Sequence, residues 1–274
     1  MDSILELQYI MSTIVTFEDC KFENNSGQCL QQDTVTICET HIKRCIFNNN
    51  HGGSGCAIYS ASGGHGIYIT IEDCIFSNNN VTSNWSPLGG AIYTTTSSIK
   101  FEGIDQFINN EVNYENSERF IPSFYQGECG GLIYIIQSIS SKIILNKKLK
   151  KFSFSTYGGS FCSTIEGTIN IEQCKFFKCR ADNGGDIYCT DESRETPSTL
   201  TVTNYIFNNS LGRQHGSDIY ITSNSFQLSE FIFDNMVEYS SVIYADLVGE
   251  NVAQKVIKCN FTHCDQQIIF KSGI

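Results

Sequence analysis

Cysteine recurs two residues before phenylalanine along this sequence, and this spacing is the first pattern that could carry chemistry. The copies are Cys20-Lys21-Phe22, Cys45-Ile46-Phe47, Cys74-Ile75-Phe76, Cys174-Lys175-Phe176 and Cys259-Asn260-Phe261. Elsewhere the same position holds Phe152, Tyr205 or Phe231, so it accepts thiols and large aromatic rings alike. That tolerance favours half-buried packing of a small, weakly polar thiol.

Two chemical alternatives stay open for these cysteines. If neighbouring copies lie on adjacent strands about 4.8 Å apart, Cys45 could form a disulfide with Cys20 or with Cys74. A metal ion could instead be held by Cys174 and Cys179, or by Cys259, His263 and Cys264. No second ligand pair has the spacing of a zinc site, so we predict no metal and no cofactor.

Asp186 and Asp218 are the best candidates for a pair of carboxylates. Each precedes an Ile-Tyr dipeptide and occupies the same position in successive copies of a repeat. We expect both side chains to point outward, beside Tyr188 and Tyr220. Such a pair could recruit a cation, or could hydrolyse a glycoside if its carboxyl groups were about 5–9.5 Å apart. A solvated pair that only adds to the surface charge is the alternative interpretation.

Tyrosine also recurs at one position of the repeat. The copies are Tyr59, Tyr93, Tyr134, Tyr188, Tyr220 and Tyr244. Stacked aromatic rings stabilise neighbouring strands, which is the structural interpretation of this pattern. If the row is exposed, it could bind sugars or an extended partner. We therefore predict a candidate carbohydrate or partner surface made of Tyr93, Tyr134, Tyr188, Tyr220, Asp186 and Asp218.

These residues belong to a repeat whose period lies in the range of roughly 20–50 residues that is typical of solenoids. Each copy reads apolar-x-x-(Cys or aromatic)-x-Phe, followed by Gly-Gly-x-Ile-Tyr, as in Gly184–Tyr188. Apolar residues alternate with a period of two, which indicates β-strands. The three-residue step from Ile171 to Cys174 predicts one bend, and the asparagine pair after each phenylalanine predicts a second.

The Ile-Tyr segment supplies a third strand, entered through the glycines. Three short strands and three bends per copy predict an all-β, three-sided parallel β-helix of about nine coils. Within the third strand, we expect Ile and the residue after Tyr to point inward. Tyr and the residue before Ile are expected to point outward.

Phe-x-x-Asn paired with Gly-Gly-Ala-Ile resembles the polymorphic membrane protein repeat of autotransporter-type adhesins. The residues that carry the resemblance are Phe22–Asn25, Phe47–Asn50, Phe76–Asn79, Phe107–Asn110 and Gly89–Ile92. It covers nearly the whole chain, from Ile14 to Phe270. The resemblance implies a right-handed β-helix at a cell surface or outside the cell, with adhesion or immune variation as its role. Cys179 and Cys264 depart from it, because they replace the asparagine.

Composition excludes several classes of protein. The 274 residues carry a net charge of −11, so nucleic acid and anionic lipid surfaces are disfavoured partners. No stretch has the composition of a signal peptide or the length of a transmembrane helix. We expect residues 1–13 to form an N-terminal cap or leader and residues 14–274 to form a single β-helix domain.

The sequence therefore predicts a non-enzymatic, adhesin-like surface protein that recognises a cell-surface glycan or protein through its corner loops and its tyrosine row. Asn80 and Asn84, expected in a long loop, are candidate glycosylation sites. A C-terminal coil without a cap predicts self-association through the exposed strand edge.

Two alternative functions stay open. One alternative is a pectate lyase-like or polygalacturonase-like enzyme, although only Gly64-His65-Gly66 resembles a catalytic signature. The other is a purely structural segment of a longer surface protein.

Overall fold

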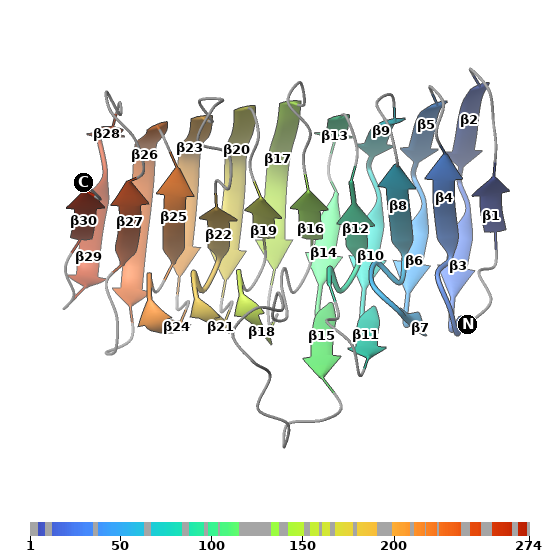
Figure 1. The fold of residues 1–274 in the computed structure, drawn as a ribbon, viewed down its shortest axis with the longest axis horizontal. Coiled ribbons are helices and arrows are strands. Elements are labelled where there is room, and N and C mark those ends of the chain that lie inside the picture. Colours follow the sequence, from blue (N-terminus) through green and yellow to red (C-terminus); the bar gives the residue numbers. More distant parts are fainter. Residues whose placement is uncertain are drawn as a thin grey trace.

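Every regular element described in the computed structural model of this chain is a β-strand, and every pairing between strands is parallel. The chain winds into a rod with its N- and C-terminal ends at opposite ends (Figure 1). This architecture confirms the predicted all-β parallel solenoid. The structure describes residues 5–8, 13–34, 38–62, 67–83, 88–95, 98–103, 105–114, 133–136, 142–150, 154–158, 161–164, 168–177, 180–190, 199–208, 211–216, 218–223, 225–236, 242–247, 254–264 and 268–272.

The Ile-Tyr segments form one continuous parallel sheet along the rod, seen in front in Figure 1. Its ten strands are β1 (Leu5–Gln8), β4 (Leu30–Thr34), β8 (Ile58–Ser62), β12 (Ile92–Thr94), β16 (Ile133–Ile136), β19 (Phe161–Thr164), β22 (Ile187–Thr190), β25 (Ile219–Ser223), β27 (Ile243–Leu247) and β30 (Ile268–Ser272).

The two segments before and after the first bend of each coil form a 14-stranded sheet behind it. In some coils the bend separates two strands: β2 (Thr13–Glu18), β5 (Cys38–Lys43), β9 (Ile67–Glu72), β13 (Ser98–Glu102) and β28 (Gln254–Ile257) before it, and β3 (Lys21–Glu23), β6 (Ile46–Asn48), β10 (Ile75–Ser77), β14 (Gln106–Ile108) and β29 (Asn260–Cys264) after it. In others one long strand covers both segments: β17 (Lys142–Lys150), β20 (Thr168–Phe177), β23 (Thr199–Asn208) and β26 (Ser225–Met236).

A fourth short strand follows the asparagine bend in several coils, which the three-strand prediction missed. These strands lie along the lower side of the rod in Figure 1 and form two small parallel sheets. The members are β7 (His51–Gly52), β11 (Asn80–Ser83) and β15 (Glu111–Tyr114), then β18 (Phe154–Tyr157), β21 (Arg180–Asn183) and β24 (Leu211–His215).

The number of layers also differs from the expected nine coils. The segment expected to be an N-terminal cap contributes β1, in which Leu5 lies opposite Leu30 of β4. At the other end, Val256 of β28 is 37% exposed, whereas Leu228, its partner in β26, is fully buried. Self-association through this edge stays a prediction.

In several of the described coils, the first bend has one residue with a left-handed backbone. Asp19, Arg44, Asp73, Glu230 and Lys258 have φ angles between 51° and 61°. This conformation turns the chain in three residues, as the step between the apolar residue and the cysteine predicted. In β26 the bend lies inside the strand, at Glu230.

The asparagine pair builds the second bend and a ladder along the rod. The first asparagine of each pair takes positive φ, for example 54° at Asn78. The second is buried and bonds to its equivalent in the next coil: Asn50 Nδ2 donates to Asn79 Oδ1 at 2.9 Å, and Asn79 Nδ2 donates to Asn110 Oδ1 at 2.8 Å. Asn79 Nδ2 also donates to the carbonyl oxygen of Phe47 at 3.0 Å. Each buried amide thus joins its own coil to both neighbouring coils.

The glycine before each Ile-Tyr strand is required by its backbone conformation. Gly89 has a φ of 60°, and a Cβ atom placed on it would lie 2.1 Å from the carbonyl oxygen of Ile92. Gly184 shows the same geometry, with 2.2 Å to the carbonyl oxygen of Ile187. Any side chain at these positions would collide with the backbone of the strand that follows.

Phenylalanine rings stack in the core directly behind the asparagine ladder. Phe47 and Phe76 have centroids 4.9 Å apart and nearly parallel planes, and Phe76 stacks on Phe107 at 4.7 Å. All of these rings are buried. The core of the rod is therefore a set of columns that run along its axis, each made of one residue from every coil.

We expect the exchange of Asn79 for alanine to lower the free energy of unfolding by about 3 kcal/mol or more. It leaves several buried polar groups of the two neighbouring coils without a bond, each at a cost of about 1–3 kcal/mol. The matched control is Asn78→Gly, which keeps the left-handed backbone of the exposed neighbour and should cost at most about 1 kcal/mol. Urea denaturation measures both, and equal losses would contradict the role given to the ladder.

The buried phenylalanine column gives a second prediction. Phe76→Ala should lower the free energy of unfolding by about 3–5 kcal/mol, because it opens a cavity between two stacked rings. Ser77→Ala, on the half-exposed neighbour, should cost about 1 kcal/mol for the hydrogen bond between Ser77 Oγ and Asn48 Oδ1. The two midpoints of denaturation would coincide only if the inward assignment of Phe76 were wrong.

Candidate functional site

The tyrosine row is present on the sheet of Ile-Tyr strands, as the sequence predicted. Tyr59 and Tyr93 stack with ring centroids 5.0 Å apart. Farther along the rod, Tyr220 stacks on Tyr188 at 4.8 Å and on Tyr244 at 5.1 Å, with planes within 12° of parallel. Tyr59, Tyr93, Tyr188 and Tyr220 are half-buried, and Tyr244 is buried.

Cys162 interrupts this row. In the register of the sheet, Tyr134 pairs with Cys162, and Cys162 pairs with Tyr188. The Cys162 side chain is 2% exposed and packs against Tyr188, so it fills the place of a ring. The strand positions of the row therefore form two blocks of three tyrosines on either side of β19. The side chain of Tyr134 lies outside the described residues.

Stacking restricts what the row can present to a ligand. Within each stacked pair the rings cover one another's faces, so their edges and hydroxyl groups are what remains at the surface. Burial, together with the neighbouring Tyr59, raises the pKa of Tyr93 above its ordinary value of 10.0. Its hydroxyl is therefore protonated at neutral pH and can both donate and accept a hydrogen bond. The row is suited to hydrogen bonding along its length more than to stacking against a sugar ring.

Asp186 and Asp218 do not belong to this surface, contrary to the prediction. Both side chains are fully buried. In other coils their position holds Ala57, Ala91 and Val242, which are members of the apolar core. The candidate surface therefore loses its carboxylates and consists of the tyrosines alone.

The prediction was wrong because strand alternation was extended one residue too far. β22 begins at Ile187, and Asp186 precedes it in the glycine turn. The backbone N–H groups of Asp186 and Ile187 both donate to the carbonyl oxygen of Asp218, at 3.0 and 2.8 Å, which is not the pattern of a regular ladder. The turn directs both side chains of the Asp-Ile pair inward.

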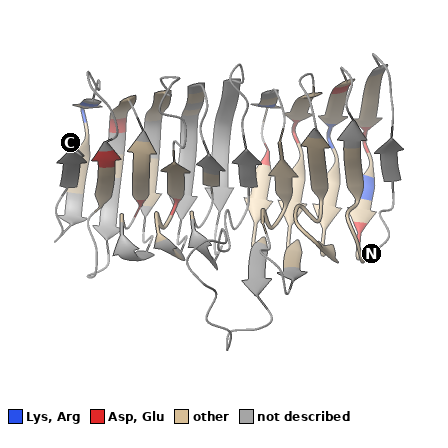
Figure 2. Ribbon diagram, in the orientation of Figure 1, with Lys and Arg blue, Asp and Glu red and all other residues tan. Residues whose placement is uncertain are grey.

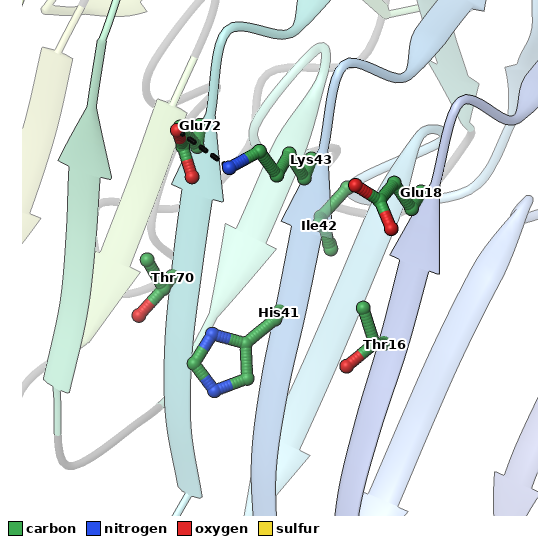
Figure 3. A pocket seen from close by; sticks show the side chains of 7 residues that line it. All are labelled: Thr16, Glu18, His41, Ile42, Lys43, Thr70 and Glu72. Carbon is green, nitrogen blue, oxygen red and sulfur yellow. Dashed lines mark ion pairs between the residues drawn. The ribbon is translucent and has the colours of Figure 1, made fainter.

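A shallow hollow of about 290 Å³ lies on the outer face of β2, β5 and β9 (Figure 3). His41 lies between Thr16 and Thr70, its partners in the neighbouring strands. This group was not predicted from the sequence, although Glu39, His41 and Lys43 alternate with buried residues along one strand. That alternation of polar residues was the available signal.

Ion pairs occupy the carboxylates at one end of the hollow. Lys43 Nζ lies 2.9 Å from Glu72 Oε1, and Arg44 lies 2.6 Å from Glu18 Oε1. Arg44 also donates to Asp19, at 2.7 and 2.8 Å, which lowers the pKa of that carboxyl group. Glu18, Asp19 and Arg44 are exposed, and Lys43 and Glu72 are only half-buried, so each pair contributes little to stability. Among the described residues, charged positions are scattered along the rod between uncharged ones (Figure 2).

The remaining predicted sites are only partly described. Asn80 is half-buried at the start of β11, opposite His51 and Glu111, and not in a loop. Asn84 lies outside the described residues, as do the side chains of Cys174, Cys179, His263 and Cys264 and most of the corner loops. Within the part of the chain that the structure describes, no group of three or more potential ligands could hold a metal ion.

Comparison with known proteins gives no relative. No family model, no curated protein and no solved structure matches this chain. No helix capable of crossing a lipid bilayer occurs among the described residues. The resemblance to the polymorphic membrane protein repeat stays a prediction.

Replacement of Asp218 by alanine tests the inward assignment. Because Ala57 and Ala91 occupy the same column in other coils, we expect the free energy of unfolding to stay unchanged or to rise, by up to about 2 kcal/mol. An outward, solvated carboxylate would also tolerate alanine, so Asp218→Lys is the second variant. It should destabilise the rod by at least about 3 kcal/mol, and a soluble, equally stable lysine variant would contradict the burial of this position.

Proposed function

We propose that this protein is a non-catalytic recognition rod that binds an extended ligand along its tyrosine row, at a cell surface or outside the cell. The observation that carries the proposal is the row itself. Tyrosines repeat along the sheet in two blocks, and the described rings of neighbouring coils are stacked at the spacing of the sheet, with Tyr59, Tyr93, Tyr188 and Tyr220 partly accessible to solvent. A ligand that is itself a repeating chain can match such a row over several coils.

The chemistry of the row favours a neutral or cationic ligand that is rich in hydrogen-bonding groups. The chain carries a net charge of −11, which repels anionic polymers. Hydroxyl edges match the hydroxyl groups of a neutral glycan or the backbone of an extended peptide segment. The stacked rings are preorganised by the sheet, so little conformational entropy is lost when the ligand binds.

Contacts in the hollow of Figure 3 support binding over hydrolysis. Acid–base cleavage of a glycoside needs one carboxyl group that can donate a proton and another that is free to act as base or nucleophile. Glu18 and Glu72, which lie in the same row with one coil between them, are both held in ion pairs. The tyrosine row lies on a different sheet from this hollow.

Binding to arrays of neutral glycans and of surface-protein peptides tests the proposal. Tyr220→Phe removes one hydroxyl group and keeps the stack, so we expect about tenfold weaker binding at unchanged stability. Tyr68→Phe is the matched control, since Tyr68 is 48% exposed on the other sheet and should have no effect. Equal binding by all three proteins would contradict the role of the row, and release of shortened glycans would support the hydrolytic alternative.

A further inference from the structure

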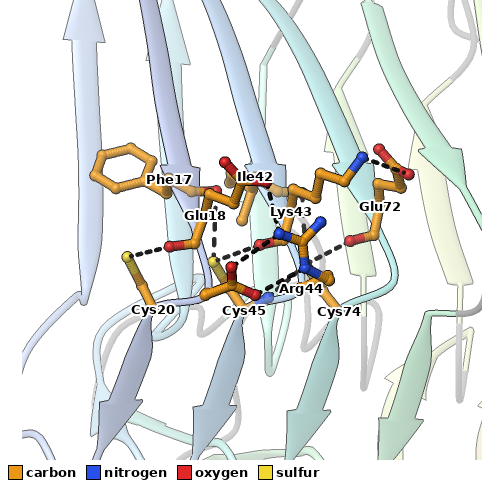
Figure 4. Close-up of polar contacts among 10 residues, drawn as sticks. Phe17, Glu18, Cys20, Ile42, Lys43, Arg44, Cys45, Glu72 and Cys74 are labelled. Atoms are coloured by element: carbon orange, nitrogen blue, oxygen red, sulfur yellow. Dashed lines mark hydrogen bonds and ion pairs between the residues drawn. The ribbon is translucent and has the colours of Figure 1, made fainter.

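Three cysteines lie directly above one another at the first bend of successive coils. Cys20, Cys45 and Cys74 each precede a strand whose residues pair in register, since Lys21 lies opposite Ile46 and Ile46 opposite Ile75. Figure 4 shows the three side chains in one row across β3, β6 and β10. The next position of the row is Asp105, whose carboxylate accepts a hydrogen bond from the backbone N–H of Cys74 at 2.8 Å.

Hydrogen bonds hold the three sulfur atoms in equivalent positions. Each sulfur atom lies 3.3 Å from the carbonyl oxygen two residues before it. The backbone N–H of Cys45 also donates to Cys74 Sγ at 3.4 Å. All three thiols are free; Cys45 and Cys74 are fully buried, while Cys20 is only half-buried.

We propose that Cys20 and Cys45 form a redox-active pair that closes to a disulfide when the folded protein meets a peroxide. The half-buried Cys20 is the thiol that the oxidant reaches, and Cys45 is the thiol that attacks it. In-register neighbours on parallel strands are about 4.8 Å apart, within the range of about 4.4–6.8 Å between Cα atoms that disulfides span. Disulfides also need their Cβ atoms about 3.5–4.5 Å apart, so closure draws the two bends slightly together as the side chains rotate.

The reaction balances with hydrogen peroxide as the oxidant. Cys20 first loses its proton to water, its thiolate attacks one peroxide oxygen, and the O–O bond breaks; Cys20 becomes a sulfenic acid, and the departing hydroxide takes up the released proton and leaves as water. The Cys45 thiolate then attacks the Cys20 sulfur, the S–O bond breaks, and the departing hydroxide takes up the proton that Cys45 has lost. Two thiols and one peroxide thus give one disulfide and two waters.

The surroundings assign the two roles. A side-chain hydrogen bond from the Cys74 thiol, distinct from the backbone bond above, lowers the pKa of Cys45 and favours its thiolate, and bonds to Cys20 and to the backbone act in the same direction. The same bond raises the pKa of Cys74, and burial raises it further, so Cys74 stays protonated as a donor. Burial also raises the pKa of Cys20, so its thiolate is a minor species. Its role as the first thiol to react is therefore assigned from its access to solvent.

Peptide mapping distinguishes the possible disulfides. The reduced, folded chain is treated with one equivalent of hydrogen peroxide, alkylated and digested with trypsin, which leaves Cys20 in peptide 1–21 and both Cys45 and Cys74 in peptide 45–100. We expect these two peptides to become linked and to separate again on reduction. A disulfide between Cys45 and Cys74 would instead lie inside peptide 45–100. Its mass would be lower by two hydrogens than that of the same peptide with both thiols free, and this result would overturn the assignment. Recovery of Cys20 only as an alkylated thiol or a higher oxide would do the same.

Single variants then test each position. Cys45→Ser should abolish the link, whereas Cys56→Ser, which removes the other buried thiol of the same peptide, should leave it intact. Cys74→Ala should keep the link but slow its formation several-fold near neutral pH, because the thiolate of Cys45 loses its donor. An unchanged rate in Cys74→Ala would contradict the role of the shared hydrogen bond. Circular dichroism shows whether each variant is folded. The peptide map of the wild-type protein tests the disulfide even if a variant does not fold.

Discussion

In-register parallel pairing places the residues of most described strands opposite their equivalents in the next coil, and the rest of the structure depends on that constraint. A column is stable only if its residue can contact a copy of itself. Asparagine meets this condition because its amide is both donor and acceptor, so that Asn50, Asn79 and Asn110 form a continuous hydrogen-bonded ladder inside the rod. Phenylalanine meets it through parallel stacking at just under 5 Å. Lysine or glutamate could fill neither column, because like charges at that spacing repel.

The same constraint made much of the fold predictable. Columns of identical residues appear in the sequence as a repeat, so Phe-x-x-Asn and Gly-Gly-x-Ile-Tyr were enough to predict the parallel solenoid and its main bends. The first bend could be placed because a three-residue step breaks the alternation before the cysteine. The others could be placed from residue type, because asparagine after the phenylalanine tolerates a left-handed backbone and glycine enters the third strand, where a Cβ atom on Gly89 or Gly184 would collide with the backbone.

The errors arose where side-chain direction is set by a turn and not by a strand. Period-two alternation applies only inside a strand, and Asp186 precedes β22, so its outward direction did not follow from the pattern. A carboxylate in a column otherwise filled by Ala57, Ala91 and Val242 also contradicts the usual preference for burial of apolar residues. The short strands after the asparagine bend were missed for a related reason. The segment His51–Gly52 is too short and too polar to resemble a strand in the sequence. It is a strand because it pairs with β11.

Stacking also determines which chemistry the rod can carry. It covers the facing sides of the Tyr188 and Tyr220 rings, which changes the contact that we expect for the proposed ligand from stacking to hydrogen bonding. At the first bend it brings together thiols that lie some 25 to 29 residues apart in sequence, as in the contact between Cys45 and Cys74. Neither property belongs to a single residue, since a lone tyrosine would expose its face and a lone buried thiol would be inert.

Interruptions of a column are as informative as the column. Cys162 divides the tyrosine row into two blocks, and Asp105 ends the run of thiols. Under the proposed function, a ligand that spans both tyrosine blocks would have to bridge the coil of Cys162, and this coil would set the register of a repeating polymer on the rod.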